Sequence, residues 1–191
     1  MRLSALILDL DETLIHASSE KLNTEPDFTC FNYFVYKRPF LKEFLNHINQ
    51  YFELAVWSSA DDDYVQVVVD KIFPKGIKLS FVWWRSKCTP KVNLNIDEYG
   101  YYDFNNLAHM NYIKRLRKLK KLGFTMERML IVDDTPHKCT ENYGNAIYPE
   151  VFEGNLNDDE LPLLQEYLKS LKDLNNVRYL EKRFWRNEIK K

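Results

Sequence analysis

Three short apolar runs along the chain are each followed directly by side chains that carry oxygen. Segments with helical spacing of apolar residues separate these runs, which is the pattern of a parallel sheet covered by helices. The pattern predicts an α/β fold with a central parallel sheet. The runs are 5–8, 54–57 and 129–132, and the residues that follow them are 9–13, Ser58 with Ser59, and Asp133 with Asp134.

The remaining segments predict helices, one more strand and an insertion. Apolar residues at 145–148 predict a fourth strand, and the alternating aromatic pattern from 77 to about 102 predicts a small antiparallel insertion. We take this insertion as about 77–110; because it is too short for a separate domain, residues 1–191 are expected to form a single domain. Helices are expected from Pro39 to 48 and over 61–72, 112–122, 159–171 and 177–188.

Composition and charge exclude several classes of protein. The chain is 45% hydrophobic, which excludes a wholly disordered or collagen-like chain. Its 27 basic and 28 acidic residues give a net charge of -1, so it has no overall attraction to nucleic acid or to an anionic membrane. No run of about 18 apolar residues occurs, and no membrane span is expected.

The cysteines and the first residues bear on location. Three cysteines without metal-ligand spacing are typical of free thiols in a reducing compartment. Asp9, Asp11 and Glu12 interrupt the apolar start, which argues against a secretion signal. We therefore expect a protein of the cytoplasm, or of the nucleus in a eukaryote, that is neither secreted nor membrane-spanning.

The acidic residues after the first and third apolar runs predict a metal site. The carboxyl ends of parallel strands share one edge of the sheet, where α/β proteins bind ligands. Asp9 and Asp11 are two residues apart and begin on the same side of their strand. Asp133 and Asp134 add two more carboxylates, and such a group repels itself unless a cation or a proton intervenes. Ligation by oxygen alone suits Mg²⁺.

A magnesium site with these neighbours can catalyse phosphoryl transfer. One carboxylate can attack phosphorus and form an aspartyl phosphate, while the other gives a proton to the leaving oxygen and later takes one from water. Ser58 can donate a hydrogen bond to a phosphate oxygen, and Lys114 can offset the negative charge of phosphate and nucleophile together.

Ordered motifs carry a resemblance to a known family. The first, DLDET at 9–13, is similar to the DxDxT signature of haloacid dehalogenase superfamily phosphatases. With four further motifs, the chain resembles the phosphatases of the RNA polymerase II carboxy-terminal domain, also called NLI-interacting-factor type. The resemblance implies a three-layer Rossmann-like fold without a large cap. The further motifs are KRPFLKEFL at 37–45, FELAVWS at 52–58, YIK at 112–114 and IVDDTP at 131–136.

The resemblance implies a role for each matching catalytic residue. Asp9 is implied as the nucleophile and Asp11 as the general acid and base. Ser58 takes the hydroxyl role that Thr or Ser fills in the family, and Lys114 clamps the phosphate. Thr13 and Arg85 are assigned to substrate binding, Arg85 because it matches an arginine of the family's insertion that approaches the phosphate.

The resemblance also implies the metal ligands. Asp9, the backbone carbonyl of Asp11 and Asp134 are implied to hold Mg²⁺, with Asp133 in support near Lys114. The stretch 89–110 is longer than the compact insertion of the human-type enzymes, where the family reads its peptide. The peptide preference and the oligomeric state stay open.

A site without a large lid favours a phosphate displayed on a macromolecule, so we expect a phosphoserine or phosphothreonine protein or peptide as substrate. A phosphatase of nucleotides, polynucleotide ends or small metabolites is one alternative. A non-catalytic binding module, as in mitochondrial import receptors that resemble this fold, is another.

Basic segments at 114–121 and near the C-terminus keep nucleic acid possible as a partner but not favoured. Five aromatic residues fit a peptide-binding wall or core packing equally well: Trp83, Trp84, Tyr99, Tyr101 and Tyr102.

Overall fold

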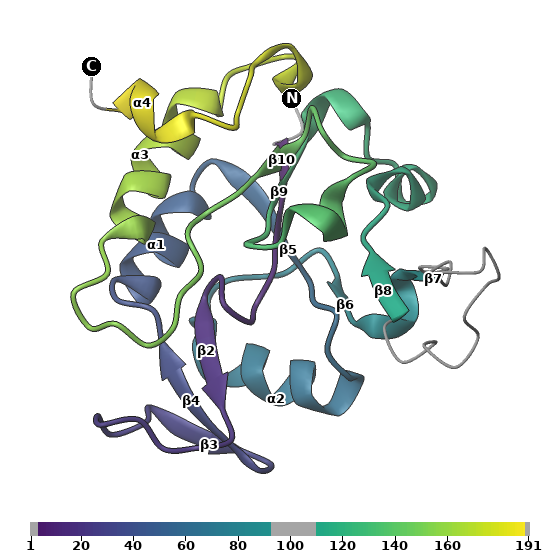
Figure 1. The fold of residues 1–191 in the computed structure, drawn as a ribbon. Helices are drawn as coiled ribbons and strands as arrows, with labels where there is room; N and C mark the ends of the chain where they lie inside the picture. Colours follow the sequence, from purple (N-terminus) through teal and green to yellow (C-terminus); the bar gives the residue numbers. More distant parts are fainter. Residues whose placement is uncertain (1–3, 93–109, 190–191) are drawn as a thin grey trace, which may run out of the picture.

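A computed structural model describes residues 4–92 and 110–189 of the chain (Figure 1). Its central feature is a sheet of five parallel strands in the order β10-β9-β1-β5-β6. The predicted central parallel sheet is confirmed. The strands are β1 (Ser4–Leu8), β5 (Phe52–Trp57), β6 (Val82–Trp83), β9 (Met129–Val132) and β10 (Ala146–Ile147).

The register places the ends of the three middle strands level with one another. Leu8, the last residue of β1, pairs with Val56 of β5 and with Val132 of β9. The residues that follow these strands therefore meet at one edge of the sheet, as the sequence predicted.

The two faces of the sheet bury different side chains of β1. Leu6 and Leu8 belong to one apolar cluster with α1 (Leu41–Ile48), α2 (Asp62–Ile72), α3 (Glu160–Leu171) and α4 (Trp185–Ile189). Ala5 and Ile7 belong to a second cluster, with the 3-10 helix Leu116–Leu122 and with Cys139. This alternation follows from the two-residue period of a strand and gives the predicted three layers (Figure 1).

Two small antiparallel sheets accompany the central one. A three-stranded sheet in the order β2-β4-β3 follows β1, with strands Ile15–Ser18, Tyr33–Lys37 and Phe28–Cys30, and lies beside α2 in Figure 1. A two-stranded sheet joins β7 (Thr89–Val92) to β8 (Met110–Ile113). A small antiparallel sheet is thus confirmed, but between 89–92 and 110–113 and not at 81–84, while Tyr99, Tyr101 and Tyr102 lie outside the described residues.

The prediction of a helix over 112–122 was wrong in its first part. Tyr112 and Ile113 pair with Pro90 and Thr89 as the end of β8, and a 3-10 helix begins only at Leu116. The apolar spacing of 113, 116 and 119 imitates a helix, but β7 supplies the backbone partners of the first residues. Lys114 consequently lies in the connection after a strand.

Three other boundaries differ from the prediction. Trp83 lies in β6, a parallel edge strand of the central sheet, and not in the antiparallel insertion. The helix expected from Pro39 begins at Leu41, because Phe40 adopts a left-handed conformation with φ 63°. The C-terminal helix expected over 177–188 is divided into the 3-10 turn Val177–Tyr179 and α4.

The ammonium group of Lys182 accounts for the divided C-terminal segment. Lys182 is buried and donates hydrogen bonds to the backbone carbonyls of Gly144, Val177 and Leu180. In a continuous helix the carbonyl of Val177 would accept from a backbone N–H instead.

Among the described residues, no helix has both the length and the apolar character needed to cross a membrane.

Candidate active site

Asp9 stands at the end of β1 with a cation on each of its carboxylate oxygens. Lys114 Nζ lies 2.8 Å from Oδ1 and Lys138 Nζ lies 3.3 Å from Oδ2. Burial opposes ionisation of this carboxyl, but the two ammonium groups outweigh it and hold its pKa below the usual value. Asp9 is therefore a buried carboxylate that stays charged.

Lys114 joins two of the predicted acidic residues. Its fully buried ammonium lies 2.6 Å from Asp133 Oδ2 as well as 2.8 Å from Asp9 Oδ1. Burial alone would lower the pKa of Lys114, and the two carboxylates raise it well above the usual value. The predicted neighbourhood of Lys114, Asp9 and Asp133 is present in the structure.

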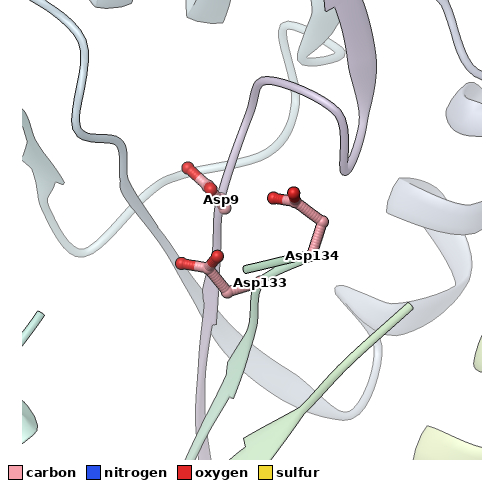
Figure 2. A group of neighbouring side chains, drawn as sticks. All are labelled: Asp9, Asp133 and Asp134. Atoms are coloured by element: carbon pink, nitrogen blue, oxygen red, sulfur yellow. The ribbon is translucent and has the colours of Figure 1, made fainter. Parts of the chain in front are cut away.

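Three carboxylates gather where β1 and β9 end. Asp9, Asp133 and Asp134 each present an oxygen, and these atoms lie within 4.8 Å of one another (Figure 2). Thr135 Oγ1 donates to Asp134 Oδ2 at 2.8 Å, which fixes the orientation of that carboxylate. A compact donor set made of oxygen alone fits Mg²⁺.

Thr13 is hydrogen-bonded to one member of this group of carboxylates, Asp134. It is fully buried, its hydroxyl donates to Asp134 Oδ1 at 3.3 Å, and it accepts from the backbone N–H of Asp134 at 3.1 Å. In this structure the hydroxyl of Thr13 thus positions a carboxylate. Its predicted contact with substrate stays a prediction.

Asp11 receives a hydrogen bond from a tyrosine that the sequence analysis missed. Tyr64, near the start of α2, donates its hydroxyl proton to Asp11 Oδ1 at 2.5 Å. Burial raises the pKa of Asp11, while this hydrogen bond opposes the rise. A carboxyl with a raised pKa is suited to giving up and taking a proton near neutral pH.

Ser58 lies directly after β5 and is buried. Its Oγ accepts a hydrogen bond from the backbone N–H of Ala60 at 3.0 Å, which leaves the hydroxyl proton available to another acceptor. Since Val56 pairs with Leu8, the serine stands at the same edge of the sheet as Asp9.

Arg85 lies on the rim of a cavity of about 510 Å³ that also reaches Asp11. Its guanidinium donates to the backbone carbonyl of Ser59 and to Asp61 Oδ1, both at 2.8 Å. Arg85 thus shares a cavity with Asp11, while its partners are the Ser59 carbonyl and the exposed carboxylate of Asp61. The cavity is lined by Asp11, Glu12, Ala17, Phe31, Tyr33, Ala60, Asp61, Asp63, Tyr64 and Arg85.

The two described members of the aromatic group are both half-buried and both pack on the core. Trp83 packs edge to face on Trp57, with ring centroids 4.8 Å apart, against the apolar cluster on one face of the sheet. Trp84 packs against the other cluster and also lines a second cavity together with Arg85. Core packing therefore describes Trp83, and Trp84 combines core packing with a place on a cavity wall.

Lys138 is the second residue that the sequence analysis missed. It belongs to the 3-10 helix Pro136–Cys139 and reaches Asp9 from the turn after Asp133 and Asp134. A lysine four residues after Asp134 has no distinctive spacing among 27 basic residues. Its position after a proline turn that starts at the site edge is the only signal in the sequence.

Comparison with models of known protein families identifies the family of this chain. A family model described as "NLI interacting factor-like phosphatase" matches residues 4–178. The chain belongs to this family.

Relatives within the NLI interacting factor-like family are similar along most of this chain. It is 30% identical over 181 residues to the CTD small phosphatase-like protein 2 of Dictyostelium discoideum, covering 91% of this chain and 28% of that protein. It is 29% identical over 190 residues to a CTD nuclear envelope phosphatase 1 homolog of Drosophila melanogaster, covering 91% and 69%. The chain thus spans between about a quarter and about two thirds of these relatives' own length.

Solved structures are similar in fold. The structure of Fcp1, an essential RNA polymerase II CTD phosphatase, superposes with a TM-score of 0.55 at 19% identity, covering 99% of this chain and 61% of that one. Fission yeast Fcp1-R271A bound to beryllium fluoride gives a TM-score of 0.52 at 20% identity, covering 90% and 51%. The predicted haloacid dehalogenase fold is therefore confirmed.

Proposed function

We propose that this member of the NLI interacting factor-like phosphatase family is a Mg²⁺-dependent phosphatase that hydrolyses phosphoserine or phosphothreonine in proteins through an aspartyl phosphate. One observation carries the proposal: Asp9 is a buried carboxylate with Lys114 on one oxygen, Lys138 on the other, and two more carboxylates beside it. We propose further that residues 1–191 act as one phosphatase domain. A location in the cytoplasm or nucleus stays a prediction.

The proposed reaction consists of two in-line displacements at phosphorus. Asp9 attacks the phosphorus of the monoester, the bond to the seryl or threonyl oxygen breaks, and protonated Asp11 gives its proton to that leaving oxygen. Asp11, now a carboxylate, takes a proton from water as the water oxygen attacks the phosphoaspartate. Phosphate leaves, and both aspartates return to their starting states.

Bound Mg²⁺ would supply charge neutralisation for the phosphate and the nucleophile. The residues proposed to hold it are Asp9 and Asp134 through their carboxylates and Asp11 through its backbone carbonyl. Asp133 acts in support, because its carboxylate is hydrogen-bonded to Lys114. Ser58 and Arg85 are proposed to bind phosphate oxygens.

The cavity beside Asp11 supports a peptide as the substrate. Its wall carries the exposed side chains of Phe31 and Tyr33 together with Arg85. Such a wall offers apolar contact to residues next to a phosphorylated side chain, a contact that a small sugar phosphate cannot use.

The deciding experiment measures phosphate release from phosphoserine, phosphothreonine and phosphotyrosine peptides, nucleotides and sugar phosphates, with Mg²⁺ or EDTA. Asp9→Asn removes the nucleophile, and Asp70→Asn on the exposed face of α2 is the matched control. We expect metal-dependent release from phosphoserine or phosphothreonine peptides that Asp9→Asn abolishes and Asp70→Asn leaves intact.

Three results would contradict the proposal. Near-wild-type release by Asp9→Asn removes that residue from the nucleophile role. Faster turnover of sugar phosphates or nucleotides than of every phosphopeptide replaces the proposed substrate class. Absence of release from the whole panel, with Mg²⁺ bound, favours a binding module of the same fold.

A further inference from the structure

Lys138 differs from Lys114 in the surroundings of its ammonium group. Both lie on the carboxylate of Asp9, but the side chain of Lys114 is fully buried and that of Lys138 is 17% exposed. Lys114 already has two carboxylate partners, Asp9 and Asp133. One described carboxylate, that of Asp9, lies within ion-pair distance of Lys138. An ammonium has three N–H donors, so Lys138 has donors left for a ligand.

The backbone around Lys138 fixes its position relative to the site. Its N–H donates to the carbonyl of Thr135 at 3.0 Å, and its own carbonyl accepts from the N–H of Lys114 at 2.8 Å. Cys139, the next residue, is fully buried. The main chain of Lys138 is therefore hydrogen-bonded to that of Lys114. These backbone hydrogen bonds fix the position of the turn that carries the Lys138 side chain.

A bound phosphate adds negative charge to an already acidic site, and the ammonium of Lys138 can offset part of it. Asp9, Asp133 and Asp134 contribute three negative charges and a phosphate monoester dianion adds two, of which the proposed Mg²⁺ would offset two. Lys114 gives two of its three N–H donors to carboxylates and is fully buried, and Arg85 gives one N–H to Asp61. Lys138 also lies on Asp9, but with one carboxylate partner and a 17% exposed side chain it has more donors left for a ligand than Lys114 has.

We propose that Lys138 is a second phosphate-binding cation, whose ammonium donates to the oxygens of the phosphoryl group as it moves to Asp9. The inference rests on the proposed function, since it names a further residue of the same site. It adds Lys138 to Lys114, which the resemblance implies as the phosphate clamp and which also lies on the carboxylates of Asp9 and Asp133. Charge placed where negative charge gathers in the transition state is the largest common contribution to such catalysis.

The test uses the full chain with Lys138→Met, Lys138→Arg and the exposed control Lys121→Met. Calorimetric titration with tungstate, an unreactive phosphate analogue, in the presence of Mg²⁺ measures anion binding without turnover. We expect Lys138→Met to weaken tungstate binding by about tenfold to hundredfold, the loss of one charge-assisted hydrogen bond. Lys138→Arg restores most of the affinity, and Lys121→Met binds as wild type does.

Two further readouts separate phosphate contact from a structural role. Titration with Mg²⁺ alone should give an affinity at least as high as that of wild type in Lys138→Met, because the variant removes a positive charge from a proposed metal ligand. Circular dichroism should show an unchanged fold. If Lys138→Met fails to fold, Lys138→Gln keeps a polar side chain and serves the same titrations.

Two outcomes would overturn the inference. Tungstate affinity equal to wild type in Lys138→Met or Lys138→Gln places the ammonium outside the phosphate site. Weaker Mg²⁺ binding in these variants would show that Lys138 supports the metal site and not the phosphate. A wild-type protein that hydrolyses no substrate, yet binds tungstate through Lys138, would refute the proposed function and leave this inference standing.

Discussion

The hydrogen bond from Tyr64 to Asp11 ties a residue of α2 to the proposed acid and base. Because the phenol stabilises the carboxylate, its removal should raise the pKa of Asp11 further. In Tyr64→Phe the acid stays protonated to higher pH, so the alkaline decline of kcat/KM should move up by about one pH unit. Release of phosphate from phosphoaspartate, which needs the carboxylate form, should slow at neutral pH. Rate profiles from pH 5 to about 10 and a burst experiment measure both effects.

Tyr33→Phe is the matched control for that change. Tyr33 lines the same cavity and packs edge to face on Tyr64, with ring centroids 6.1 Å apart. It should leave the profile in place. An equal shift in both variants would mean that the effect comes from the aromatic wall and not from the Asp11 hydrogen bond.

Ser58 offers a second test at the scale of single residues. Its Oγ already accepts from Ala60, so a proton remains to be donated to phosphate. Ser58→Ala should lower kcat/KM by about tenfold, the contribution of one hydrogen bond to a charged group, while Ser58→Thr keeps the hydroxyl and most of the rate. Ser59→Ala is the neighbouring control, and a larger loss there would reassign the role to Ser59.

At the scale of elements, a buried guanidinium links the start of α1 to the segment before α3. Arg38 forms a bidentate pair with Asp158, both distances 2.7 Å, and donates to the carbonyl of Thr13 at 3.0 Å. Arg38→Met removes one partner of a buried pair, and we expect a loss of about 3 kcal/mol in the free energy of unfolding.

Urea denaturation measures this loss, with Lys21→Met as the control. Lys21 pairs with Glu25 on the exposed surface, where a pair contributes below about 0.5 kcal/mol. Replacing both partners, Arg38→Met with Asp158→Leu, should recover part of the stability because no charge is then left buried alone. Equal losses in Arg38→Met and Lys21→Met would show that the buried pair adds nothing.

The central sheet could be predicted because its strands are continuous apolar runs that end in oxygen-bearing residues. That combination is local in sequence, as in the run that ends at Asp9. The start of the 112–122 segment was not predictable in this way, since Tyr112 and Ile113 become a strand only through pairing with β7. A partner distant in the sequence decides between strand and helix there, and spacing alone does not reveal it.

Some residues of the candidate site could likewise be predicted from the sequence, and others could not. Asp9, Asp133 and Asp134 follow strands, so their convergence could be derived from the topology. Tyr64 and Lys138 reach the site from α2 and from a 3-10 turn, and their roles depend on the direction of a side chain. Neither residue type nor spacing in the sequence reports that direction.

At the scale of the whole molecule, metal binding should stabilise the fold. Three carboxylates within 4.8 Å of one another outnumber the two ammonium groups that lie on them, and an ion that binds the native state alone adds to its stability. At a Mg²⁺ concentration 100 times Kd we expect a gain of about 2.7 kcal/mol, or a rise in Tm of about 5 to 10 °C. Thermal unfolding with Mg²⁺ and with EDTA measures the shift.

Asp134→Asn should abolish most of that shift while keeping the shape of the side chain. NaCl at equal ionic strength is the control for general screening. A full shift in Asp134→Asn would remove this carboxylate from the metal site.

The register of β1 with β5 and β9 has a consequence for how activity arises during folding. Asp9 follows β1, but Lys114 and Lys138, which keep it charged, and Asp134, which completes the acidic group, follow β8 and β9, late in the chain. A chain in which β9 has not yet paired with β1 thus has Asp9 without these neighbours, and we expect it to be inert toward phosphate esters. Recovery of turnover after dilution from denaturant should therefore report when β9 pairs with β1. We expect it to lag behind the return of the helical circular dichroism signal.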